Sequence, residues 1–194
     1  MKKTFVLLLA LCMAAVLFAV PVFAEGDGNA QPVDTQQALE EALAAAAPAG
    51  GTVTLEGNIT LKTPITVPAK VTLDGARYTL TADTDFKGSY VVLATGNLSN
   101  VTVNAAGMAN YAVQVYGETA NVTLTNVAMQ NGKYSGLVVN NGASASLKGC
   151  TFAGNGFSAV ELADGKDHSG AAPKLTVDSL TDEVTVRADV SANA

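Results

Sequence analysis

An internal repeat constrains the fold of this 194-residue chain more than any other feature. In the second half of the sequence, short apolar segments return after 21 to 24 residues. One aligned column contains residues 101–103, 122–124 and 145–147, and another contains residues 113–115, 137–139 and 160–162. A unit this short cannot enclose a hydrophobic core by itself, so successive copies must stack and bury their apolar faces against one another.

Within each unit, apolar residues alternate with other residues over three short stretches, which is the period of a β-strand with one buried face. Gly and Asn separate the stretches, and both accept the positive φ of tight corners. Three strands and three corners describe one turn of a parallel β-solenoid. Fainter turns begin at Val53-x-Leu55, and a last one contains Leu175-x-Val177. We predict an all-β parallel solenoid over residues 52–186.

Residues 34–51 predict a capping α-helix and its exit turn before the first strand. Asp34 and Gln37 resemble a capping box, the apolar residues of 38–46 share one helical face, and Gly50 and Gly51 end the helix. The far end has only a polar tail, residues 187–194, to blunt its exposed edge. Self-association of the solenoid end to end is therefore one expected interaction.

The first 24 residues have the pattern of a secretory signal peptide. Lys2 and Lys3 precede an apolar run over residues 5–20, and Ala24 completes a small-residue cleavage site. The run is shorter than a membrane span. Residues 25–33 follow as a flexible leader. We therefore expect a bacterial protein that is secreted, extracellular or periplasmic, without membrane association after cleavage.

Cleavage leaves 9 basic residues against 17 acidic ones, so the mature chain is acidic. Such a chain repels nucleic acid and anionic lipid, which excludes nucleic acid as an expected partner. Cys150 is the one cysteine beyond the signal segment, so no disulfide forms within the chain. We expect Cys150 to be a small buried residue.

The layout resembles the right-handed parallel β-helix (pectin-lyase-like) superfamily, which includes pectate lyases, polygalacturonases and secreted repeat proteins. The resemblance rests on the helix and its exit, residues 38–55, on Val71-Thr72-Leu73-Asp74-Gly75, and on the Asn- and Gly-cornered turns up to Leu162. It implies a right-handed, single-stranded helix. It does not specify an activity, because the scaffold supports lyases, hydrolases, adhesins and viral spikes.

The resemblance implies two enzymatic reactions, and each requires particular residues in the sequence. A lyase of this kind uses Ca²⁺ and an Arg base, and the mature chain has Arg77 near Asp74 as its candidate. A hydrolase needs carboxylates within roughly 10 Å of each other. In the outward column Asp74, Asn104, Thr125, Lys148 and Asp178, the two acids lie roughly 19 Å apart at the spacing of stacked strands. We expect no catalytic residues.

Metal and cofactor sites have little support. His168 is the only histidine, which leaves zinc without a ligand set. Two acidic pairs, Asp83 with Asp85 and Asp164 with Asp167, would give at most a weak Ca²⁺ site, and such pairs are more often solvated. We expect no cofactor.

Surface side chains are the remaining candidates for function. Tyr111, Tyr134 and Phe157 are spaced by 23 residues each, which predicts an aromatic ladder on stacked turns. An external ladder would be a platform for sugar rings, whereas an internal or corner stack would only stabilise the solenoid. Gln114 and Glu161 occupy outward positions nearby.

The predicted function is that of an exported, non-catalytic β-helix protein that binds a polysaccharide or another glycan of the cell envelope. The predicted binding residues are Tyr111, Tyr134, Phe157, Gln114 and Glu161. Two alternatives stay open: a small polysaccharide lyase with its site near Arg77 and Asp74, and a purely structural solenoid.

Overall fold

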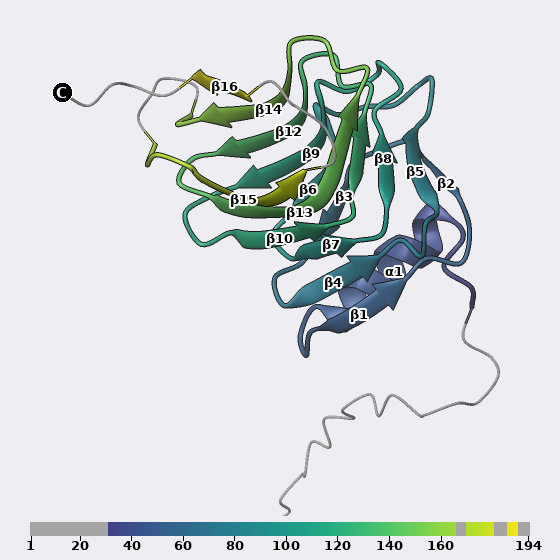
Figure 1. Ribbon diagram of the computed structural model, residues 1–194. Coiled ribbons are helices and arrows are strands. Elements are labelled where there is room, and N and C mark those ends of the chain that lie inside the picture. The colour runs from purple at the N-terminus through teal and green to yellow at the C-terminus, as the bar shows by residue number, and fades with distance from the viewer. Residues whose placement is uncertain (1–30, 166–169, 181–185, 190–194) are drawn as a thin grey trace, which may run out of the picture. The chain divides into compact units, whose positions relative to one another are not determined.

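The computed structural model describes residues 31–165, 170–180 and 186–189. In this part of the chain, one short α-helix is followed by a parallel β-solenoid of about five turns (Figure 1). The predicted fold class is confirmed. No helix among the described residues is long and apolar enough to span a membrane.

Each complete turn contributes one strand to each of three faces, called here sheets A, B and C. The strands are short and alternate between buried and outward residues; in both β2 and β3 the two outer residues are buried and the central Thr is exposed. Sheet A contains β1 (Gly51–Thr54), β4 (Val71–Asp74), β7 (Asn97–Ser99), β10 (Asn121–Thr125), the first part of β13 (Ser144–Ala153) and β15 (Lys174–Leu180).

Sheets B and C complete the turns. Sheet B contains β2 (Ile59–Leu61), β5 (Thr79–Ala82), β8 (Thr102–Asn104), β11 (Ala128–Gln130) and the second part of β13. Sheet C contains β3 (Ile65–Val67), β6 (Tyr90–Ala94), β9 (Tyr111–Tyr116), β12 (Ser135–Asn140), β14 (Ser158–Ala163) and β16 (Val186–Asp189). Since β13 continues around a corner, it joins sheets A and B into one ten-stranded sheet.

The register corrects one column of the predicted repeat. The sequence aligns residues 101–103 with 122–124, but Leu124 pairs with Leu98, and Val103 pairs with Met129 in sheet B. Likewise Ser99, not Asn104, is the partner of Asp74, and Ser179, not Asp178, is the partner of Lys148. The error arises because alternating segments from neighbouring faces look alike in sequence when the turns differ in length. The column of residues 113–115, 137–139 and 160–162 is confirmed.

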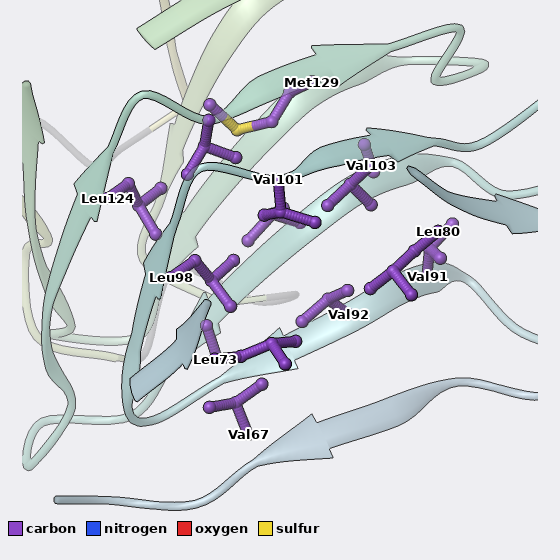
Figure 2. Packing of buried hydrophobic residues seen from close by; sticks show 14 of the residues in the cluster. Val67, Leu73, Leu80, Val91, Val92, Leu98, Val101, Val103, Leu124 and Met129 are labelled. Atoms are coloured by element: carbon purple, nitrogen blue, oxygen red, sulfur yellow. The ribbon is translucent and has the colours of Figure 1, made fainter. Parts of the chain in front are cut away.

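The core consists of ladders of apolar side chains from successive turns (Figure 2). One ladder on sheet A runs through Leu73, Leu98 and Leu124, whose exposed fractions are at most 1%. Stacking like residues at the strand spacing of about 4.8 Å removes each from water on both sides. Cys150 is also buried, as expected, and its thiol donates to the Leu124 carbonyl at 3.3 Å.

Asparagines with positive φ stabilise the corners. Asn100 and Asn126 have φ of 49° and 52°, and the Asn126 Nδ2 donates to the Asn100 Oδ1 at 3.1 Å. Asn100 in turn donates to the Asp74 carboxylate at 3.2 Å. Asn tolerates the left-handed region and its amide can hydrogen-bond to the turn below, which explains its recurrence at this corner.

The helix α1 (Gln36–Ala46) covers the first turn, where it contacts β1, β2 and β3. Leu39 and Leu43 face this turn and are buried. The N-cap is Thr35, whose hydroxyl accepts the Ala38 N–H at 3.2 Å, and not the predicted Asp34. Both residue types cap helices well, so the sequence placed the start only to within one residue.

Candidate binding surface

The outer side of sheet C carries the predicted site, and a local bend decides which side chains reach it. In β6 and β9 two consecutive residues are buried in the core, Val91 with Val92 and Ala112 with Val113. Strict alternation is therefore interrupted. The residues just before this bend, such as Tyr111, turn toward the same side as Gln114 and Glu161.

A hydrogen-bonded cluster confirms that Tyr111 and Glu161 share one side. The Tyr111 hydroxyl donates to Glu161 Oε1 at 3.2 Å, and the Ser135 hydroxyl donates to Glu161 Oε2 at 3.3 Å. Ser135 and Ser158 are joined at 2.7 Å through their hydroxyls. Because β12 lies between β9 and β14, the Tyr111 side chain must cross β12 to reach Glu161. Each hydrogen bond to the buried carboxylate offsets part of its desolvation.

The three aromatic rings contact one another beside this cluster. The Tyr111 and Tyr134 ring centroids are 6.0 Å apart at 73°, and those of Tyr134 and Phe157 are 5.2 Å apart at 33°. Tyr134 and Phe157 lie at the corner before β12 and β14, and they are 42% and 62% exposed. These two rings are therefore at a corner and open to solvent, whereas Tyr111, within β9, is partly buried.

The equal spacing in sequence does not correspond to one register column. Tyr111 pairs with Ser135, so it lies one position further along its turn than Tyr134 does. The rings still meet because an aromatic side chain is long enough to bridge this offset. Two members of the site, Ser135 and Ser158, were missed by sequence analysis. Each directly follows an aromatic of the ladder, which was a visible signal.

Glu161 and Gln114 differ in how available their side chains are to a ligand. Glu161 is 8% exposed and both of its carboxylate oxygens already accept hydrogen bonds. It therefore positions the Tyr111 hydroxyl rather than facing solvent as a free acceptor. Gln114 is half-buried, and it pairs in register with the buried Val138.

A hollow of about 440 Å³ lies at the corner that precedes β12 and β14 in the chain. Its lining is mostly glycine, and Lys133 is the charged side chain in it. Lys133 and Gly156 immediately precede Tyr134 and Phe157 in sequence, so the chain that lines the hollow leads directly into the two exposed aromatic residues. Lys133 was not singled out by sequence analysis.

A second hollow, of about 280 Å³, is lined by Arg77, Asn100, Val101, Thr102 and Asn126. The Asp74 carboxylate accepts from Asn100 and, at 3.0 Å, from the Ala76 N–H. Asp74 is thus part of the corner that shapes the backbone around Arg77, whose own φ is 74°. Arg77 and Asp74, the candidate residues for a lyase, lie on the same corner. Arg77 lines the hollow, whereas Asp74 is not among its lining residues.

The acidic pairs behave as loop residues where they are described. Asp83 forms a turn in which its carboxylate accepts the Asp85 N–H at 2.9 Å, and this hydrogen bond lowers the pKa of Asp83. Asp167 and His168 lie outside the described residues. Among the described residues, no three His, Cys, Asp or Glu side chains come together as metal ligands.

Comparisons with known proteins found no matching family model, no similar curated protein and no similar solved structure.

Proposed function

We propose that this chain is an exported, non-catalytic β-solenoid protein that binds a glycan through its aromatic surface, defined as Tyr111, Tyr134 and Phe157. The observation that carries the proposal is the pair of exposed rings, Tyr134 and Phe157, which contact each other at one corner. Large aromatic side chains are costly to leave in water, and an exposed pair beside a hollow is typical of a recognition site.

The chemistry of the surface suits a sugar ring. A pyranose has an apolar face of C–H groups and a rim of hydroxyls, so it needs an aromatic face with hydrogen-bonding groups nearby. The Tyr134 and Phe157 rings would supply the first. The Tyr111 hydroxyl, whose ring contacts Tyr134, and Lys133, which directly precedes Tyr134, would supply the second. Parallel strands repeat about every 4.8 Å, which favours an extended chain over a single compact ligand.

The cluster around Glu161 preorganises this surface. Glu161 and Ser135 hold Tyr111 across β12, and Tyr111 in turn contacts Tyr134. A side chain that is already ordered loses less conformational entropy when a ligand binds. We therefore assign Glu161 a positioning role.

Export is supported by the basic start and apolar run of residues 1–24. The acidic mature chain favours neutral or cationic partners over nucleic acid. Intact-mass measurement of the protein recovered outside the cytoplasm tests this part, because cleavage after Ala24 requires a chain that starts at Glu25.

A glycan array followed by titration calorimetry tests the binding proposal. Tyr134→Ala and Phe157→Ala should each weaken binding about tenfold, since each removes one ring of a stacked pair. Tyr116→Ala is the matched control, because Tyr116 is 47% exposed on sheet C but has no ring contact with the aromatic surface among the described residues. Binding that is as strong in both ring variants as in the wild type, or no glycan bound at all, would contradict the proposal.

The lyase alternative is tested with the same preparation. Polyuronate is incubated with and without Ca²⁺, and the ultraviolet absorbance of an unsaturated product is recorded. Product that survives purification and is lost in Arg77→Ala would replace the binding proposal with a lyase.

A further inference from the structure

The last turn of the solenoid differs from the turns below it. Among the described strands, β15 pairs only with β13, and β16 pairs only with β14. Each therefore has one edge with backbone N–H and C=O groups that no described strand uses. Such an edge is a template for pairing with another chain.

The apolar side of β15 is also incompletely covered. Val177 is 46% exposed although it pairs in register with Leu147, which is fully buried. Leu175 is partly buried, whereas its partner Ala145 is 2% exposed. Backbone hydrogen-bonding groups that no described strand uses and incompletely buried apolar side chains therefore lie at the same end of the solenoid.

The opposite end is closed to the same kind of addition. There α1 contacts all three strands of the first turn, and Leu39 and Leu43 pack on it. A second copy can therefore add at the end formed by β15 but not at the helix end. Head-to-tail stacking into a filament is blocked, and pairing of two like ends gives a closed dimer.

The sequence of β15 is complementary to itself when two copies run antiparallel. Its first five residues are Lys174-Leu175-Thr176-Val177-Asp178. About a two-fold axis at Thr176, Lys174 lies opposite the partner's Asp178, and Leu175 lies opposite the partner's Val177. Each charged pair then has opposite signs, and each apolar pair extends the inner side of sheet A.

We propose that two copies of this chain form a two-fold dimer through antiparallel pairing of β15. The proposal goes beyond glycan binding and does not depend on it. The regular part of the edge lacks Pro and has no inward charge, which are two of the usual protections against pairing. Leu147 pairs with Val177 but Lys148 pairs with Ser179, so the regular stretch of β15 is residues 174–177, and Asp178, which takes part in both charged pairs, lies at the register shift that follows it.

Charge-reversal variants compared with the wild type by sedimentation equilibrium test the proposal. The protein is purified from cells that express residues 1–194. Wild-type protein should change from monomer to dimer with rising concentration and stop there. Lys174→Glu and Asp178→Lys should each weaken the dimer about tenfold, because two attractive pairs become repulsive. The double variant Lys174→Glu/Asp178→Lys should recover most of the affinity.

Recovery in the double variant is specific to antiparallel pairing between two copies. Residues 174 and 178 lie about 13 Å apart along an extended strand, too far for one copy to restore its own pair. Lys148→Glu is the matched control, because it makes the same charge change at an exposed position on β13, one turn below. Val177→Asp should abolish the dimer while the circular dichroism spectrum stays that of the wild type.

Three results would overturn the proposal. They are a wild-type protein that stays monomeric at every concentration, a mass that rises beyond the dimer, and a double variant that is weaker than both single variants.

Discussion

Valine occupies the same core column at both ends of the solenoid, but it is buried at one end and exposed at the other. Val53 and Val177 are the first and last members of the sheet A ladder that runs through Leu73, Leu98, Leu124 and Leu147. Val53 is 7% exposed under α1, whereas Val177 is 46% exposed. In a stacked fold, the burial of a residue depends on whether a further layer covers it, and less on the residue itself.

This difference also implies that inner turns and terminal turns differ in stability. The inner turns gain apolar burial from both neighbours, whereas a terminal turn gains it from one. The N-terminal end compensates with a helix. The described C-terminal end instead presents an edge that a second copy can cover.

The largest effect should come from a cavity in the middle of the ladder. Leu124→Ala should lower the free energy of unfolding by about 2–5 kcal/mol, since Leu124 is fully buried between two turns and solvent cannot fill the space it leaves. Val177→Ala at the exposed end should lower it by less than about 1 kcal/mol. Urea unfolding followed by circular dichroism measures both. Equal losses at the two positions would mean that the last turn is packed as tightly as the centre.

A somewhat smaller loss is expected from the helix that closes the other end. Leu39→Ala should destabilise the chain by about 2–3 kcal/mol, because Leu39 is buried against the first turn but the outer layer can partly relax into the space. Glu41→Ala, on the exposed side of α1, is the control and should stay within about 0.5 kcal/mol of wild type. If Leu39→Ala matched Glu41→Ala in urea unfolding, α1 would not be acting as a cap.

The smallest effect concerns which end opens first. Burial raises the pKa of the Cys150 thiol, so the folded protein keeps it in the unreactive protonated form near neutral pH. Cys150 lies one turn below β15, and Val71 lies one turn above β1. In a Cys150→Ser background, Val71→Cys places a buried thiol at the matching distance from the capped end.

Thiol labelling in low urea compares the two positions. At concentrations at which the chain is monomeric, Cys150 should react about tenfold faster than the thiol at position 71, because an uncovered terminal turn opens locally more often than a capped one. Similar rates that both follow global unfolding would show that the ends are equally stable.

The fold was predictable because its signals are local and repeated. Alternation of apolar residues indicated the strands, and Asn or Gly at positive φ indicated the corners, as at Asn126 and Gly107. The register of sheet A was less predictable. Leu98 and Val103 are both single apolar positions in short alternating segments, and only pairing between turns assigns them to sheets A and B.

The candidate site was predictable in composition but not in geometry. The spacing of Tyr111, Tyr134 and Phe157 predicted ring contact, which the ring distances confirm. The spacing did not reveal that Glu161 is buried under the Tyr111 side chain or that Ser135 completes its hydrogen bonds. Those contacts cross three strands, and they join Tyr111 to a carboxylate 50 residues away in sequence.

The sequence by itself therefore determined the class of fold, the cap helix and the aromatic composition of the surface, because each depends on residue type and local periodicity. The tertiary structure decided the register between turns, the bend that brings Tyr111 to the outer side, and the difference in cover between Val53 and Val177. These depend on how turns of unequal length stack, and stacking is a relation between distant segments that no local pattern contains.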